Sequence, residues 1–162
     1  MKNLFIVRHG IYDSSGQLTN LGIEHTNLLG RRLKSKLDCQ SIYLTSSPAR
    51  RAYQSAEILA KCLGISEIEK IPYLCSDVTC EDFYSEFHPG ALGKMMKIVE
   101  ERSGKADNLI LMTHQDVCRS FTPYFTEKEF GYETALGTIG NSESIHFDLE
   151  KKDVNILSFS NE

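Results

Sequence analysis

Short apolar segments alternate with amphipathic helical segments along this chain, and this alternation limits the possible folds more than any other feature. Residues 3–7 and 108–112 are wholly or largely apolar, as expected of strands in a sheet covered on both faces. Between them, leucine and alanine recur at helical spacing over residues 19–37 and 47–63. Strands that alternate with helices form parallel sheets with helices on both faces. We therefore expect an α/β fold, a three-layer α/β/α sandwich with a mostly parallel central sheet.

Capping residues set the expected boundaries of the helices. Thr19 or Asn20 can cap the first helix. The second is expected to start at Ser46-Ser47-Pro48, with serine as the cap and proline in the first turn, and to stop at Gly64. The remaining expected elements are a strand over 41–45, a short strand within 68–74, a surface loop over 75–89, a helix over 92–101, a segment over 115–125 that is helical at its start, and a terminal hairpin over 144–149 and 154–159.

Composition limits the partners and the compartment. The 162 residues suit a single domain over 1–162, and a net charge of −4 argues against nucleic-acid and membrane partners. The absence of a membrane-length apolar run and of a targeting signal predicts a cytoplasmic protein. The five cysteines and five histidines lack metal-ligand spacing, so we expect no metal and no cofactor, and the sequence carries no signal for an oligomeric state. Cys118 is expected to be a buried thiol, and His146 to face solvent.

Basic and imidazole side chains follow three of the predicted strands. The first strand runs directly into Arg8 and His9, and the strand over 108–112 runs into Thr113-His114. The strand over 41–45 leads into a helix that carries Arg50 and Arg51. Ligands of parallel sheets bind outside the carboxyl ends of the strands. We therefore expect these groups to converge at one edge of the sheet.

Two arginines and two histidines in one pocket favour a tetrahedral dianion as the ligand. Guanidinium groups match phosphate oxygens in a bidentate way, and helix N-termini after Ser47 and His114 would add N–H donors. The sequence has neither a Gly-rich Walker loop nor clustered carboxylates, which argues against magnesium-dependent nucleotide hydrolysis. The remaining chemistry is covalent catalysis, in which a neutral imidazole attacks phosphorus while the cations spread the developing charge.

The motifs that carry this chemistry also carry a family resemblance. They are Arg8-His9-Gly10, Leu18-Thr19-x-x-Gly22, Leu29-Gly30-x-x-Leu33, Ser46-Ser47-Pro48-x-x-Arg51-Ala52-x-Gln54-Ser55-Ala56 and Thr113-His114. Together they resemble the histidine phosphatase superfamily, which has the phosphoglycerate-mutase-like fold. A late Asn-Gly-Ser sequence of that family is replaced here by Gly140-Asn141-Ser142, in a different order.

The resemblance implies a role for each matched residue. His9 would accept the phosphoryl group, and Arg8, Arg51 and His114 would complete the phosphate pocket. Ser14 or Ser15 could donate to the phosphate from the first loop, and a hydroxyl that bonds its own loop is an equal alternative.

Arg51, and not Arg50, fits the Ser-Pro-x-x-Arg spacing of the family. Adjacent residues on a helix diverge by about 100°, so only one of the two arginines is expected to face the pocket.

The general acid of the family is missing from its usual place. Many members have a glutamate where this chain has Ser76, and the adjacent Asp77 is our tentative proton donor. Other candidates on the same predicted loop are Glu81, Asp82 and Glu86. The short spacing between Arg51 and His114 resembles the compact branch that contains the bacterial SixA-type phosphohistidine phosphatases, which also lack the usual acid.

This departure makes hydrolysis of protein phosphohistidine the leading hypothesis. A phosphoramidate leaves as imidazole, which gains its proton more readily than an alkoxide does. The partner would be a phosphorylated protein or, failing that, a small phosphate ester. The alternatives are a broad phosphomonoesterase or a serine/threonine protein phosphatase with Asp77 or Glu81 as the acid, and, from another class, a non-catalytic phosphate-binding module.

Overall fold

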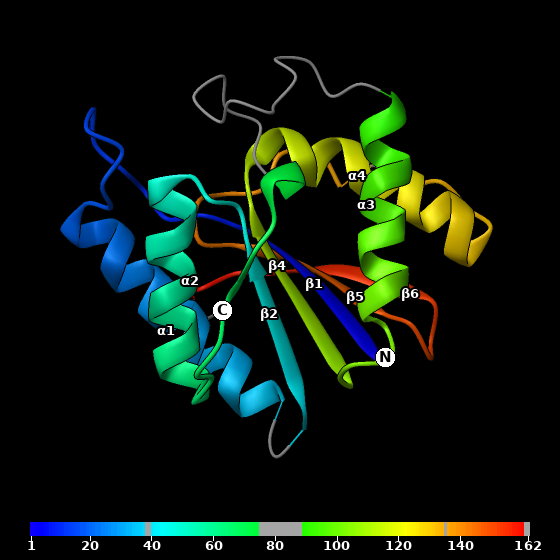
Figure 1. Cartoon of the computed structure of the whole chain (residues 1–162), viewed down its shortest axis with the longest axis horizontal. Helices are drawn as coiled ribbons and strands as arrows, with labels where there is room; N and C mark the ends of the chain where they lie inside the picture. The colour runs from blue at the N-terminus through cyan, green and yellow to red at the C-terminus, as the bar shows by residue number, and fades with distance from the viewer. Residues whose placement is uncertain (38–39, 75–88, 135, 161–162) are drawn as a thin grey trace.

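A six-stranded sheet forms the middle layer of the fold in this computed structural model, which describes residues 1–37, 40–74, 89–134 and 136–160 (Figure 1). The strands follow the order β3-β2-β4-β1-β5-β6 across the sheet. Their bounds are β1 (Asn3–Arg8), β2 (Ile42–Ser46), β3 (Glu69–Lys70), β4 (Asn108–Thr113), β5 (Ser144–Asp148) and β6 (Asp153–Leu157). The first four strands in this order run parallel, while β5 and β6 form an antiparallel hairpin. The expected mostly parallel sheet and terminal hairpin are confirmed.

Helices cover both faces of this sheet. Figure 1 shows α1 and α2 on one side of the strands and α3 and α4 on the other. Their bounds are α1 (Asn20–Lys36), α2 (Arg50–Leu63), α3 (Pro89–Arg102) and α4 (Gln115–Phe130), with a short 3-10 helix, η1 (Pro72–Leu74). This arrangement confirms the three-layer α/β/α sandwich.

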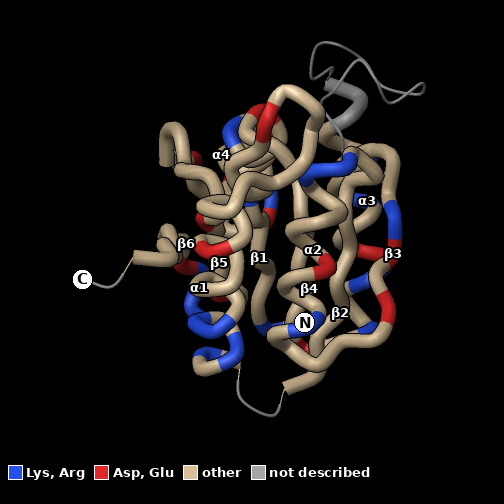
Figure 2. The backbone as a smooth tube through the Cα atoms, turned by 90° about the vertical axis from the view of Figure 1, so that its left-hand side faces the viewer, with Lys and Arg blue, Asp and Glu red and all other residues tan. Residues whose placement is uncertain are grey.

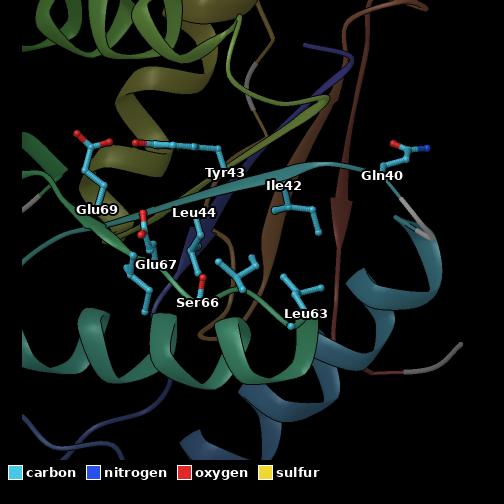
Figure 3. Close-up of a pocket in the computed structure, with 11 residues that line it drawn as sticks. Gln40, Ile42, Tyr43, Leu44, Leu63, Ser66, Glu67 and Glu69 are labelled. Atoms are coloured by element: carbon cyan, nitrogen blue, oxygen red, sulfur yellow. The ribbon is translucent and has the colours of Figure 1, made fainter.

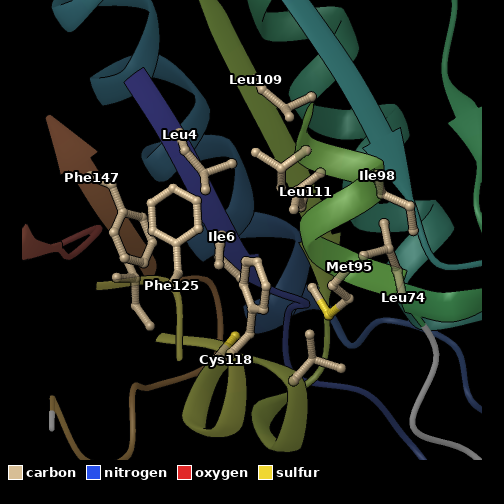
Figure 4. Packing of buried hydrophobic residues seen from close by; sticks show 14 of the residues in the cluster. Leu4, Ile6, Leu74, Met95, Ile98, Leu109, Leu111, Cys118, Phe125 and Phe147 are labelled. Atoms are coloured by element: carbon tan, nitrogen blue, oxygen red, sulfur yellow. The ribbon is translucent and has the colours of Figure 1, made fainter. Parts of the chain in front are cut away.

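The two apolar cores lie on opposite faces of β1. Leu4 and Ile6 pack into the cluster under α3 and α4 (Figure 4), whereas Phe5 and Val7 face α1 and α2. All four side chains are fully buried. Each contributes about 1.5–3 kcal/mol of hydrophobic stabilisation. The strand that ends in Arg8 and His9 is therefore held from both sides.

Burial on both faces also corrects the expectation for His146. Its side chain is only 3% exposed and stacks on Phe5, with ring centroids 4.5 Å apart. Its Nε2 lies 2.8 Å from Oδ1 of Asn3. The alternating pattern suggested a solvent-facing histidine, but β5 lies between β1 and β6 and both of its faces are covered.

Two helix boundaries differ from the sequence-based expectation. α2 begins at Arg50, with Ala49 at the N-cap position, because the chain stays extended there with ψ at 134°. The Ser47 hydroxyl instead accepts from the backbone N–H of Ala49 in a tight turn. α4 continues past Pro123 to Phe130, since Phe121 and Phe125 bury their rings in the core and outweigh the hydrogen bond lost at proline.

The short strand expected within residues 68–74 is reduced to the two residues of β3. The chain then turns into η1, which begins at Pro72. The expected surface loop over 75–89 lies outside the described residues except for its last residue, which begins α3.

Close backbone packing explains the glycine that follows His9. A Cβ atom on Gly10 would lie 2.8 Å from Oγ1 of Thr26 and 2.9 Å from the carbonyl oxygen of Gly22. A Cβ atom on Gly22 would collide with the backbone carbonyl of Ile11. The end of β1 and the first turn of α1 therefore touch backbone to backbone, which fixes the direction in which the chain leaves His9.

Positions of both charge signs are interspersed along the backbone (Figure 2). Among the residues with a described placement, no helix combines the length and the apolar character that a membrane crossing requires.

Candidate active site

The structure brings His9, Arg51 and His114 together where β1, β2 and β4 end. Nε of Arg51 donates to Nε2 of His9 at 3.1 Å, and Nη2 of the same guanidinium lies 3.2 Å from Nδ1 of His114. The two imidazole rings are 4.9 Å apart at their centroids. His9 is 4% exposed and His114 is 2% exposed. Three groups from distant parts of the chain thus form one buried basic cluster.

The hydrogen bonds of His9 define which ring nitrogen carries its lone pair. Nδ1 lies 2.8 Å from the carbonyl oxygen of Gly10, which can only accept, so Nδ1 bears the hydrogen. Nε2 accepts from Arg51 and therefore holds the lone pair. A neutral imidazole in this tautomer can act as a nucleophile through Nε2.

Burial and neighbouring positive charges keep the imidazole of His114 neutral. Its Nδ1 faces the guanidinium of Arg51, so its Nε2 donates to Oγ of Ser47 at 3.0 Å. Burial, reinforced by the charges of His9, Arg51 and Arg8, lowers the pKa of His114 from 6.5 to about 2. With His114 neutral, the positive charge of the Arg51 guanidinium makes this cluster suited to an anion.

The depressed pKa of His114 predicts acid sensitivity. Between pH 6.5 and about 2 the unfolded chain binds a proton that the folded chain does not, so the free energy of unfolding falls as the pH falls. The loss approaches about 1.4 kcal/mol per pH unit below pH 6.5. In urea titrations, wild type should lose about 2 kcal/mol more than His114→Gln between pH 7 and pH 5. Equal losses in the two proteins would contradict this assignment.

The three arginines at this edge, Arg8, Arg50 and Arg51, differ in what they contact. Arg8 donates from Nη1 to the carbonyl oxygen of Ile139 at 2.7 Å. Its Nε is buried and has no hydrogen-bond partner among the described residues. Arg50 instead lies beside Gln17, whose side-chain oxygen accepts from it when the amide is oriented to satisfy both groups. Arg51 alone of the helical pair thus contacts the two histidines, as the spacing predicted.

The backbone of His9 is anchored by a segment whose role the sequence did not reveal. The Asn141 amide donates to the carbonyl oxygens of His9 and Gly10 at 3.1 and 3.3 Å. The N–H of Ser142 bonds the carbonyls of Arg8 and His9, with Ser142 in the left-handed region at φ 58°. Its hydroxyl meets that of Thr26 at 2.9 Å. The sequence pointed to this segment only through Gly140-Asn141-Ser142, which differs in order from the Asn-Gly-Ser sequence of the family.

A second anchor comes from α2. The Ser55 hydroxyl accepts from the N–H of Gly10 at 3.0 Å and donates to the carbonyl of Arg51 at 2.8 Å. Oε1 of the preceding residue, Gln54, accepts from the N–H of Leu18 at 3.0 Å. These contacts link the helix that carries Arg51 to both ends of the loop that follows His9. Gln54 and Ser55 both belong to the motif that begins at Ser46, but the motif alone does not indicate which groups these side chains bind.

The two tentative site residues are not placed in the cluster by the described contacts. The hydroxyl of Ser15 donates to Oδ1 of Asp13 at 2.6 Å, inside its own exposed loop. Ser14 lies in the same exposed loop. Asp77 and the alternative acids Glu81, Asp82 and Glu86 lie outside the described residues.

Other candidate features lie apart from this cluster. Cys118 is fully buried, and burial raises the pKa of its thiol to about 12, which agrees with the expected structural thiol.

A cavity of about 620 Å³ lies between the start of β2 and the segment after α2, lined by residues such as Ile42, Leu63 and Glu67 (Figure 3). It includes none of the clustered residues. The described residues contain no group of three or more metal-ligating side chains.

Two histidines bridged by the Arg51 guanidinium, at the carboxyl edge of a mostly parallel sheet, form a site that suits an anionic ligand. The family model of the histidine phosphatase superfamily (branch 1) matches residues 4–75. The match includes His9 and Arg51 and covers fewer than half of the 162 residues, so it shows that this part of the chain is similar to the superfamily. The search of curated proteins finds no match.

Solved structures with the same fold include phosphatases of different substrates. The protein histidine phosphatase SixA complexed with tungstate is 20% identical, aligns over 97% of each chain and has a TM-score of 0.64. The mycobacterial glucosyl-3-phosphoglycerate phosphatase complexed with VO3 is 16% identical over 90% of this chain and 92% of that one, with a TM-score of 0.64. A structure named mycobacterial hydrolase 1 is 15% identical over 90% of each chain, with a TM-score of 0.65. At these identities the similarity shows the fold.

Proposed function

We propose that this chain hydrolyses phosphohistidine in proteins through a covalent phosphohistidine at His9. The observation that carries the proposal is the geometry of His9, whose Nε2 lone pair is presented to Arg51 while Nδ1 is tied to the Gly10 carbonyl. A nucleophile that is neutral, buried and oriented needs no activation by a separate base. The SixA and glucosyl-3-phosphoglycerate phosphatase structures hold tungstate and VO3, and a phosphate dianion fits the two guanidinium charges here.

The proposed reaction has two steps. Nε2 of His9 attacks phosphorus, the phosphorus–nitrogen bond of the substrate breaks, and the departing imidazole takes up a proton from solvent water. Arg8 and Arg51 stabilise the equatorial oxygens, Arg8 with the Nε–H that is buried without a described partner, and Nδ1 of His114 orients the Arg51 guanidinium. Water then attacks the phosphorus on His9, which releases inorganic phosphate and restores the neutral imidazole.

Leaving-group chemistry selects phosphohistidine over alkyl phosphates. Imidazole departs with less help from a general acid than an alkoxide requires. The sequence has Ser76 where many family members have a glutamate. The similarity to the SixA fold supports the same substrate class.

Steady-state hydrolysis of matched peptides tests this proposal. We expect kcat/KM for a phosphohistidine peptide to exceed that for the corresponding phosphoserine peptide by at least about 100-fold. Asp77→Asn should change the phosphohistidine value by no more than about threefold. If the phosphoserine peptide reacts faster and Asp77→Asn abolishes its turnover, the chain is an ester phosphatase with Asp77 as the acid. Phosphate binding without turnover of either peptide would instead identify a binding module.

A further inference from the structure

Tyr12 combines an exposed ring with direct contact to the catalytic cluster. Its ring centroid lies 5.1 Å from that of His9, with the two planes at 74°, and Cζ of Arg51 lies 4.6 Å from the centre of the same ring. Tyr12 is nevertheless 45% exposed, while His9 is 4% exposed. The ring therefore stands at the rim of the pocket, between the nucleophile and solvent.

The backbone that carries Tyr12 is held in place by its own hydrogen bonds. Tyr12 pairs with Leu18 in an antiparallel bridge, and the N–H of Asp13 donates to the carbonyl of Gln17 at 2.8 Å. The Asp13 carboxylate accepts from the N–H groups of Ser15 and Gln17, and the Ser15 hydrogen bonds lower the pKa of Asp13. Because the loop is closed in this way, it presents the tyrosine ring at little cost in conformational entropy.

The position of the ring relates it to the leaving group. In an in-line displacement the leaving group departs on the side of phosphorus opposite Nε2 of His9. We place that side at the rim, because the buried His9 contacts the ring of Tyr12, which is exposed to solvent. A flat leaving group that passes the rim can stack on an aromatic ring, whereas a short alkyl group offers little surface for such a contact.

We propose that Tyr12 is a specificity-determining residue that stacks on planar leaving groups and so favours phosphoryl groups attached to a ring. The imidazole of phosphohistidine and the phenol of an aryl phosphate both belong to this class. This inference rests on the proposed function, since it names the chemical class that the same phosphate pocket accepts. Arg51 fixes one side of the tyrosine ring by a cation–π contact, which leaves the exposed part of the ring to meet the substrate.

Binding of two phosphonates that cannot be hydrolysed tests the inference without turnover. Phenylphosphonate and ethylphosphonate share the anionic group and differ in the ring, and their affinities are measured by calorimetry. We expect Tyr12→Leu to weaken phenylphosphonate binding by about 3- to 10-fold and to change ethylphosphonate binding by less than about twofold. Tyr12→Phe, which keeps the ring, should retain most of the preference for phenylphosphonate.

A matched tyrosine serves as the control. Tyr132 is 42% exposed and donates its hydroxyl to the carbonyl of Lys152, outside the cluster, so Tyr132→Leu should alter neither affinity. Equal weakening of both ligands by Tyr12→Leu, or no weakening of phenylphosphonate, would overturn the inference. A selective loss for phenylphosphonate supports it even if phosphohistidine peptides are not hydrolysed, so its failure is distinguishable from failure of the proposed function.

Discussion

His9→Ala is expected to lower phosphatase activity by at least about 10⁴-fold, whichever phosphorylated substrate the wild-type protein hydrolyses. The variant removes the Nε2 lone pair that the Gly10 carbonyl and Arg51 orient. The measurement is kcat/KM on the best substrate, together with mass spectrometry for a phosphorylated enzyme after alkaline quenching, since phosphohistidine is labile in acid.

A histidine outside the cluster provides the matched control for this variant. His25 stacks on Phe159 with ring centroids 3.9 Å apart, away from the ends of β1, β2 and β4. His25→Ala should retain full activity, and thermal unfolding should show that both variants are folded. A loss of less than tenfold in His9→Ala would contradict covalent catalysis at this residue.

Arg51→Ala is expected to lower kcat/KM by about 10²–10³-fold, because it removes a cation that stabilises the charge developing on the phosphoryl oxygens. Arg50→Ala removes the same charge from the adjacent residue, whose guanidinium faces Gln17, and should cost no more than about threefold. The pair separates a specific contact from a general loss of positive charge. Activity assays on wild type and both variants at low and at moderate salt make the comparison.

Arg51→Lys refines the same prediction. Lysine keeps the positive charge but cannot bridge His9 and His114 with a planar fork, so we expect an activity between those of wild type and Arg51→Ala. If Arg50→Ala and Arg51→Ala lose activity equally, the cluster acts through net charge and the assigned role of Arg51 is wrong.

The layers of the fold were predictable because buried strands and helices have recognisable patterns of apolar residues and of capping residues. The apolar run that forms β1 is continuous, and the strand is covered on both faces. Thr19 caps α1 by accepting from the N–H of Gly22, and Gly64 ends α2 in the left-handed region at φ 74°. The start of α2 was misplaced because a serine before proline can cap a helix or close a tight turn, and the two alternatives share one pattern.

The convergence of His9, Arg51 and His114 was predictable from the rule that parallel strands present their carboxyl ends at one edge. The anchors of that cluster were not. The positive φ of Ser142 and the contact of Asn141 with the His9 carbonyl depend on a segment more than 130 positions away in the chain. Tyr12 gave no signal either, since one aromatic residue in a loop fits a core, a rim or a solvated position equally well. The catalytic roles of the clustered residues stay predictions.

The closed loop between β1 and α1 carries Tyr12, the residue proposed to select the leaving group, while the residues proposed to bind the phosphoryl group lie outside this loop. The proposed phosphate-binding residues His9, Arg51 and His114 lie just after β1, on α2 and just after β4, whereas the hydrogen bonds of Asp13 are satisfied within residues 13–17. The two ends of the loop are hydrogen-bonded to α2, through Ser55 at Gly10 and Gln54 at Leu18, and the Tyr12 ring contacts Arg51. We therefore expect that exchanging this loop would alter the choice of leaving group, while the residues proposed to bind the phosphoryl group stay in place.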